Sequence, residues 1–270
     1  MAALIKWPAE SIWESVAPTL PDFSVEILPE VDSTNTELMR RARAGRLEPV
    51  LLVAEAQTAG RGRLGRSWQS GPVSSEDTPV PSVGALPSLT FSLGLPLAPA
   101  DWSGLSLAVG VAVAESLHAD IGLKWPNDLW WQDRKLGGIL IETASLGAQR
   151  YAVIGVGLNI APREAAGLST PPAWLQAIAP ELDAPGAVGR LAAPLVQAVQ
   201  AFERLGFAPF QARFNARDML RQRPVTLSDG TRGVAQGVGE TGALRVQTAQ
   251  GLQEVTSAEV SVRPADSGGA

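Results

Sequence analysis

A short stretch crowded with glycine and arginine is the strongest candidate for chemistry in this sequence. Gln57–Trp68 reads Gln-Thr-Ala-Gly-Arg-Gly-Arg-Leu-Gly-Arg-Ser-Trp. Its glycines let the backbone fold closely around an anion, and Arg61, Arg63 and Arg66 offer planar donors that suit phosphate and carboxylate groups. No acidic residue stands among these arginines, so we expect a loop that is mobile when empty and ordered by an anionic ligand. The alternative is a solvated basic turn.

The same stretch matches a dinucleotide-binding pattern only formally. Gly60, Gly62 and Gly65 spell G-x-G-x-x-G, but no helix opens after Gly65. Glu76 and Asp77 fall in a segment rich in Pro and Ser rather than at the end of a second strand. The His-Arg-Asp and Asp-Phe-Gly motifs of protein kinases are absent as well. Neither a dinucleotide-binding protein nor a protein kinase therefore explains this loop.

A lysine and two polar residues follow near the junctions of expected strands. Pro126 interrupts a β pattern and is followed by Asn127 and Asp128. Lys135 then opens a run in which Gly137-Gly138 indicate close approach by a ligand or another backbone. Alone, Lys135 is equally well an edge lysine. Beside a cationic loop, it becomes a candidate for stabilising charge on a phosphate.

Another strand end carries the same combination of glycine and a polar side chain. Gly155-Val156-Gly157-Leu158-Asn159 clears space at two alternate positions, and Asn159 can hydrogen-bond a ligand. The structural alternative is a β-bulge with a capping asparagine.

Strands and helices interleave irregularly over most of the chain, which predicts an α+β fold with a mixed sheet flanked by helices. The expected strands are 25–28, 50–54, 89–95, 122–131, 135–143 and 151–160. Helices are expected from the Asp32–Asn35 caps to Gly45, from Asp101 or Ser103 to about Leu117, and over 187–205 and 207–220.

The pattern of residue types changes after Arg223. Five short β runs alternate with glycine turns, which predicts a small C-terminal SH3-like β-barrel. We therefore expect a catalytic domain over 1–218, a barrel over 219–265 and a disordered tail over 266–270. Residues 71–87, rich in Pro, Ser and Gly, are expected to form a flexible insertion.

Composition excludes several classes of protein and site. The net charge is −5, which disfavours nucleic-acid binding. The chain has no cysteine and a single histidine, His118, at the end of an apolar run, where a structural role is the better interpretation. Metal sites built from the protein and imidazole catalysis are therefore not expected. No signal peptide or membrane span is recognisable, and we expect a cytoplasmic protein without a membrane partner.

Together, these segments resemble the biotin–protein ligase family. The matching pieces occur in the family's order and reach from about Val25 to Arg263, and they include Ser33–Thr36, Gln57–Trp68, Lys124–Asp128, Lys135–Ile139 and Gly155–Asn159. The pairing of Gln-Thr-Ala-Gly-Arg-Gly-Arg with Lys-Trp-Pro-Asn-Asp is the most specific feature. Little sequence precedes Val25, so we expect the form that has only ligase activity and no helix-turn-helix repressor domain.

The resemblance implies a role for each matching residue. Lys135, Arg63 and Asp128 would be catalytic, with Asp128 orienting or deprotonating the attacking amine. The residues implied in binding biotin are Ser33, Thr34, Asn35, Gln57, Arg61, Gly62, Arg63, Lys135, Gly138 and Gly157. Those implied in binding ATP or the adenylate are Arg61, Arg63, Arg66, Trp68, Asn127, Lys135 and Asn159.

The implied activity is the formation of biotinyl-5′-AMP from biotin and ATP with Mg²⁺, followed by transfer of biotin to a lysine of a biotin carboxyl carrier protein. Three alternatives stay open: a lipoate-type acyl-adenylating ligase, a non-catalytic biotin- or nucleotide-binding module, and a DNA-binding biotin sensor. A homodimer is possible, and the strand at Gly155–Asn159 with its neighbours is a candidate edge.

Overall fold

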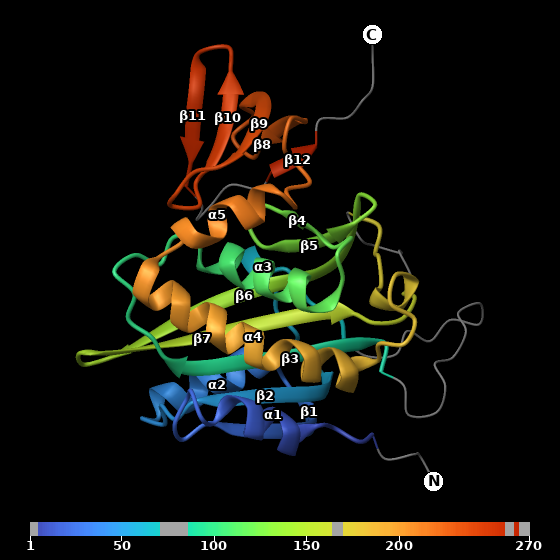
Figure 1. Cartoon of the computed structure of the whole chain (residues 1–270), viewed down its shortest axis with the longest axis vertical. Coiled ribbons are helices and arrows are strands. Elements are labelled where there is room, and N and C mark those ends of the chain that lie inside the picture. Colours follow the sequence, from blue (N-terminus) through green and yellow to red (C-terminus); the bar gives the residue numbers. More distant parts are fainter. Residues whose placement is uncertain (1–4, 71–85, 164–169, 257–261, 265–270) are drawn as a thin grey trace.

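The chain forms two sheets, seen one above the other in the computed structural model (Figure 1). The structure describes residues 5–70, 86–163, 170–256 and 262–264. The larger sheet has seven strands in the order β1-β2-β3-β7-β6-β5-β4. These strands are β1 (Ser24–Val31), β2 (Val50–Gln57), β3 (Ser88–Pro96), β4 (Gly122–Lys124), β5 (Asp128–Trp131), β6 (Arg134–Leu146) and β7 (Gln149–Asn159). β1 and β2 are parallel and the other neighbours antiparallel, so the expected mixed sheet is confirmed.

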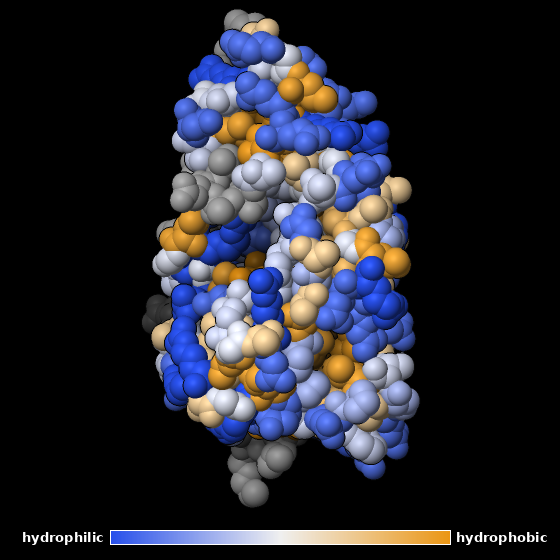
Figure 2. Space-filling view, turned by 90° about the vertical axis from the view of Figure 1, so that its left-hand side faces the viewer, coloured by the Kyte–Doolittle hydropathy of each residue, from blue (hydrophilic) through white to orange (hydrophobic). Residues whose placement is uncertain are grey.

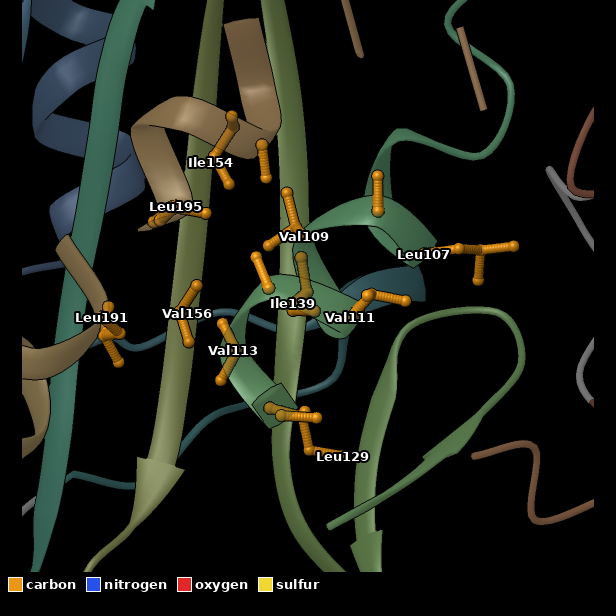
Figure 3. Close-up of a cluster of buried hydrophobic side chains, with 14 of the residues drawn as sticks. Leu107, Val109, Val111, Val113, Leu129, Ile139, Ile154, Val156, Leu191 and Leu195 are labelled. Atoms are coloured by element: carbon orange, nitrogen blue, oxygen red, sulfur yellow. The ribbon is translucent and has the colours of Figure 1, made fainter. Parts of the chain in front are cut away.

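Helices cover both faces of this sheet (Figure 1). They are α1 (Ala9–Val16), α2 (Thr34–Arg43), α3 (Leu105–Leu117), α4 (Ala184–Leu205) and α5 (Ala208–Asn215). α3 is apolar almost all round because it lies buried between the sheet and α4. The side chains between them include Val109 and Val113 of α3 and Ile154 and Val156 of β7 (Figure 3).

Successive residues of β7 therefore face different surroundings. Ile154 and Val156 point into the core, whereas Gly155 and Gly157 face the side that α2 covers. A sheet that is apolar on one side and lined by glycine on the other leaves room for polar side chains on the glycine side.

Several element boundaries differ from the sequence expectation. The run 122–131 is a hairpin of two strands, because the chain turns over Trp125–Asn127. α3 begins at Leu105 behind Gly104, and Asp101 instead accepts the backbone N–H of Ser103 at 2.9 Å. α1 was not expected at all. Ser33 does cap α2, by accepting the backbone N–H of Thr36.

The small sheet is antiparallel, with the order β11-β10-β9-β8-β12. Its strands are β8 (Pro224–Leu227), β9 (Arg232–Val238), β10 (Leu244–Thr248), β11 (Gly251–Val255) and β12 (Val262–Pro264). This matches the short C-terminal strands expected from the sequence. The sheets are joined by buried contacts, among them a hydrogen bond of 3.1 Å from the Trp125 Nε1 to the Gly242 carbonyl. We place the boundary between two domains at Asp218, as a proposal.

Asp218 lies in the connection between the two sheets, where one of its carboxyl oxygens is buried. Its Oδ1 accepts the Leu220 N–H at 2.9 Å, whereas its Oδ2 is buried without a hydrogen-bond partner among the described residues. Burial raises the pKa of Asp218 to about 6. Above that pH the folded protein must hold a buried charge, and as the pH falls through 6 it takes up a proton before the unfolded chain does.

We therefore expect Asp218→Asn to raise the free energy of unfolding at pH 7.5 by roughly 1–3 kcal/mol. The gain should fade as the pH falls and be nearly absent at pH 4. Urea unfolding of both proteins across this range tests the expectation. An equal difference at pH 4 and pH 7.5 would contradict it.

Further sequence expectations concern the segments 71–87 and 266–270 and the residue His118. The expected insertion at 71–87 and the tail at 266–270 lie almost entirely outside the described residues. His118 follows α3 directly and is partly exposed, so its side chain is not part of the core. Among the described residues, no helix has the length and apolar character needed to cross a membrane.

Candidate active site

The loop of glycine and arginine folds back on itself as a narrow hairpin. Arg61 and Ser67 pair as an isolated antiparallel bridge. The Gly62 N–H donates to the Arg66 carbonyl at 2.7 Å, and the Trp68 N–H donates to the Gly60 carbonyl at 2.8 Å. The hairpin therefore presents its arginine side chains from a defined backbone.

Two of these arginines reach different parts of the large sheet, one on β6 and the other in the turn between β4 and β5. Arg61 Nη1 lies 3.2 Å from an oxygen of Glu142 on β6, and Arg63 Nη1 donates to Asn127 Oδ1 at 3.2 Å. Burial lowers the pKa of Arg63, and the nearby Asp128 opposes that shift. The sequence expectation of arginines without an acidic neighbour was wrong for Arg61, because Glu142 is distant in sequence and meets the loop only in the folded chain.

Polar side chains at the start of α2 form a buried network beneath the loop. Gln57 Oε1 accepts the backbone N–H of Thr34 at 2.8 Å and its hydroxyl at 3.2 Å. The Ser92 hydroxyl lies 2.7 Å from both Thr34 Oγ1 and Asn35 Oδ1. Ser33, Thr34 and Asn35 are each 3% exposed. Such a network holds polar groups in one geometry, since each buried donor or acceptor that loses its partner costs stability.

The two alternate glycines of β7 make room for this network and for the loop. A Cβ on Gly155 would overlap the side chain of Asn35. A Cβ on Gly157 would lie 2.5 Å from Cε2 of Trp68, so the indole rests directly on the strand. The Trp68 Nε1 is buried and has no hydrogen-bond partner among the described residues. Both glycines are thus required by close approach, as their spacing predicts.

Lys135 is held firmly at the far end of the same surface. Its Nζ donates to Asp128 Oδ1 at 2.7 Å. Its backbone N–H donates to the Pro171 carbonyl, and its own carbonyl accepts the Ala173 N–H and, at 3.2 Å, Asn159 Nδ2. The lysine is therefore fixed in its strand, while its side chain as a whole is 32% exposed.

These contacts unite segments that are far apart in the sequence. Arg63 binds Asn127, whose neighbour Asp128 binds Lys135, while Arg61 meets Glu142, which also binds Asn35. Gly138 lies beside Lys135, where an added Cβ would be 3.4 Å from Nζ. A fixed lysine, two arginines and a cradle of glycines in one place suit a ligand that carries negative charge.

A separate cavity lies on the opposite face of the large sheet. Its volume is about 440 Å³, and its wall includes Trp102, Trp125, Ile141, Thr143 and Gly242. Figure 2 faces the side of the molecule that carries the end of the β6–β7 hairpin, and its surface is hollowed between the small sheet and the large one. None of the predicted site residues lines this cavity. The candidate site therefore lies on the other face of the sheet, which carries Gly155 and Gly157 and is called the glycine face below, and not in this hollow.

Comparisons with known proteins agree with this geometry. Residues 28–159 match the model of the Biotin/lipoate A/B protein ligase family, and residues 223–263 match that of the Biotin protein ligase C terminal domain. The chain is 37% identical over 254 residues to the bifunctional ligase/repressor BirA of Escherichia coli, covering 90% of this chain and 75% of that protein. The chain belongs to the biotin–protein ligase family.

Two other members of the family are similar over nearly their whole length. The biotin–[acetyl-CoA-carboxylase] ligase of Paracoccus denitrificans is 34% identical over 245 residues, which cover 87% of this chain and 98% of that protein. The biotin protein ligase of Aquifex aeolicus, solved in complex with biotin and ATP, superimposes with a TM-score of 0.72 at 26% identity and covers 89% of this chain and 99% of its own.

Three residues that contact the predicted site residues were missed by sequence reasoning. Glu142 on β6 and Ser92 on β3 contact Asn35 from the two strands that flank β7. Arg163 Nη1 donates to Asn159 Oδ1 at 3.0 Å, and its guanidinium lies 5.9 Å from the centre of the Trp68 ring. Burial lowers the pKa of Arg163. Only strand register reveals Glu142 and Ser92, whereas Arg163, four residues after Asn159, was within reach of the sequence pattern.

One predicted site residue is exposed at the end of the hairpin. Arg66 is exposed, and it is its backbone carbonyl that holds Gly62. The implied role of its guanidinium toward ATP remains a prediction.

Proposed function

We propose that this chain is an ATP-dependent biotin–protein ligase, which forms biotinyl-5′-AMP and transfers biotin to a lysine of a carrier protein. The family membership supports this function. The observation that carries it is the bridging of the arginine hairpin to both ends of the glycine face, at Glu142 and at Asn127. That arrangement suits an elongated anionic ligand held beneath the loop.

In the first step, an oxygen of the biotin carboxylate attacks the α-phosphorus of ATP, and the bond to pyrophosphate breaks. Two negative groups must approach each other, so positive charge and placement matter more than a base. Lys135, fixed by its strand and by Asp128, would contact the reacting carboxylate and phosphate. Arg63 would neutralise the same charge from the loop, while Ser33–Asn35 and Gln57 would hold the head group of biotin.

In the second step, the amine of the carrier lysine attacks the biotinyl carbonyl, and AMP leaves with the electrons of the carbon–oxygen bond. The closed loop would keep water away from the mixed anhydride until then. Asp128 already accepts a hydrogen bond from Lys135 at 2.7 Å. We therefore assign Asp128 chiefly to holding that lysine, and a role in deprotonating the carrier amine stays secondary.

The accompanying groups are proposed on chemical grounds. Mg²⁺ would arrive on the phosphates of ATP, since this ion usually binds through phosphate together with one or two carboxylates. The acceptor would be a biotin carboxyl carrier domain, and the location the cytoplasm.

A homodimer is also proposed, but not at β7. The expectation of an edge at Gly155–Asn159 itself was wrong, because β3 and β6 flank β7 on its two sides. Its neighbour β6 is the better edge. β5 pairs with β6 only as far as Gly138, and among the described residues no strand pairs with Leu140–Leu146 on that side. Sedimentation at several concentrations tests this.

The decisive experiment uses the full chain with biotin, Mg-ATP and a carrier domain, followed by the mass of the carrier. A gain of one biotinyl group supports the proposal. Competition with lipoate separates it from a lipoate-type ligase. Biotin binding without release of pyrophosphate would instead indicate a non-catalytic binding module.

The close packing of Trp68 on β7 leads to a prediction for Gly157. In Gly157→Ala the new methyl group must displace the indole, because its nearest ring atom lies at 2.5 Å. We expect biotin to bind at least about 10-fold more weakly, with little change in the thermal unfolding midpoint, since the strand itself tolerates alanine. Isothermal titration of biotin measures the effect. An unchanged affinity would show that biotin binding does not depend on the present position of the Trp68 indole.

A further inference from the structure

An acidic residue stands in a site whose proposed ligands are anions. Glu142 lies on β6, facing α2 and the arginine hairpin, and its side chain is 22% exposed. A carboxylate here repels a carboxylate or a phosphate, and the chemistry of adenylation gives it no task. Its contacts within the protein must therefore explain its presence.

The two oxygens of Glu142 serve different parts of the structure. Oε2 accepts a hydrogen bond from Asn35 Nδ2 at 3.0 Å, and Oε1 accepts one from Arg61 Nη1 at 3.2 Å. Asn35 belongs to the buried network at the start of α2, where its other end meets Ser92. Arg61 belongs to the hairpin and is more exposed, at 53%. One carboxylate thus connects the buried network around Asn35 to the arginine hairpin above it.

We propose that Glu142 is a positioning residue that anchors the Arg61 limb of the hairpin to Asn35 and so sets how long the adenylate is retained. The inference rests on the proposed ligase function. It assigns no contact with substrate to Glu142. Its effect is transmitted through Arg61, while Arg63 is held separately by Asn127.

The charge of Glu142 can be removed without disturbing the hydrogen-bonded network around Asn35. In Glu142→Gln, the amide oxygen can still accept the hydrogen bond from Asn35, but the ion pair with Arg61 is lost. Because this pair is partly exposed, its loss should have a modest effect, and we expect bound biotinyl-5′-AMP to be released about threefold faster. The rate of biotin-dependent pyrophosphate exchange should change less than about twofold.

A double-mutant cycle tests whether Glu142 acts through Arg61. Adenylate release is measured for the wild type, Glu142→Gln, Arg61→Ala and the double variant. We expect Glu142→Gln to add less than about 1.5-fold once Arg61 is gone, since coupled residues are not additive. Equal effects of Glu142→Gln in both backgrounds, or no effect in either, would overturn the proposal.

A matched control is available on a different part of the molecule. Glu115 on α3 makes an ion pair of 2.5 Å with Arg213 on α5, away from the glycine face. Glu115→Gln therefore removes the same charge and the same kind of pair. It should leave adenylate release unchanged, and an equal acceleration by this variant would also overturn the proposal.

A readout independent of activity separates this inference from the ligase function. The ligand-free wild type, Glu142→Gln and Glu115→Gln are treated briefly with trypsin, and cleavage after Arg61, Arg63 and Arg66 is followed by mass spectrometry. We expect about threefold faster cleavage of the hairpin in Glu142→Gln alone. A wild type that makes no adenylate would refute the ligase proposal. Equal rates of hairpin cleavage in Glu142→Gln and wild type would refute the proposal that Glu142 holds the hairpin.

Discussion

Lys135→Ala is expected to abolish adenylate formation while the protein stays folded. The ammonium group is held by Asp128 Oδ1 at 2.7 Å, and the backbone N–H and carbonyl of Lys135 are hydrogen-bonded to Pro171 and Ala173. Removing a preorganised charge at a phosphate transition state costs on the order of 100- to 1,000-fold in rate. Biotin-dependent exchange of pyrophosphate into ATP measures this step alone.

Two comparisons make the Lys135 experiment specific. Lys135→Arg keeps a positive charge in a different shape and should retain partial activity. Arg150→Ala removes an exposed cation from β7 and should leave exchange unchanged. Unfolding curves should show that Lys135→Ala is folded. Exchange near the wild-type rate in that variant would refute the assigned role.

Arg63→Ala should form the adenylate but fail to keep it. Arg63 is half-buried in the hairpin and reaches Asn127 at 3.2 Å, between the loop and the strand junction that also carries Asp128. A charge-assisted hydrogen bond to the adenylate is worth about 1.5–3 kcal/mol, so its loss should speed release roughly 10- to 100-fold. Free biotinyl-5′-AMP in the medium, trapped by a nucleophile, is the measured quantity.

The neighbouring residue provides the control for Arg63. Leu64 follows it directly, and its side chain is 61% exposed at the end of the hairpin. Leu64→Ala alters the same loop without removing a charge, and it should release adenylate at the wild-type rate. Similar release from Arg63→Ala and wild type would show that another group retains the intermediate.

Local sequence patterns predicted the parts of the site that depend on local geometry. The glycine spacing in β7 indicated close approach, and the structure places Asn35 and Trp68 against those positions. The cap at Ser33 and the break at Pro126 were likewise visible, since capping and the missing proline N–H act within a few residues.

Contacts that depend on strand order were not predictable in the same way. Glu142 reads as an ordinary polar residue in a strand, and its partners Asn35 and Arg61 are more than 80 residues away. Only the register of β6 against β7 and the packing of α2 across them bring the three together. α1 was missed because it has only eight residues and no side-chain cap marks its start.

The buried hydrogen bond between Trp125 and Gly242 ties the small C-terminal sheet to the turn that carries Asn127. A replacement C-terminal half that buries this indole without offering a carbonyl would leave its N–H unpaired, at a cost of about 1–3 kcal/mol. The two halves are thus poor candidates for exchange as separate modules between related enzymes. A chimera that imports a foreign C-terminal half will need a matching turn at Thr241-Gly242 to keep Asn127 within reach of Arg63.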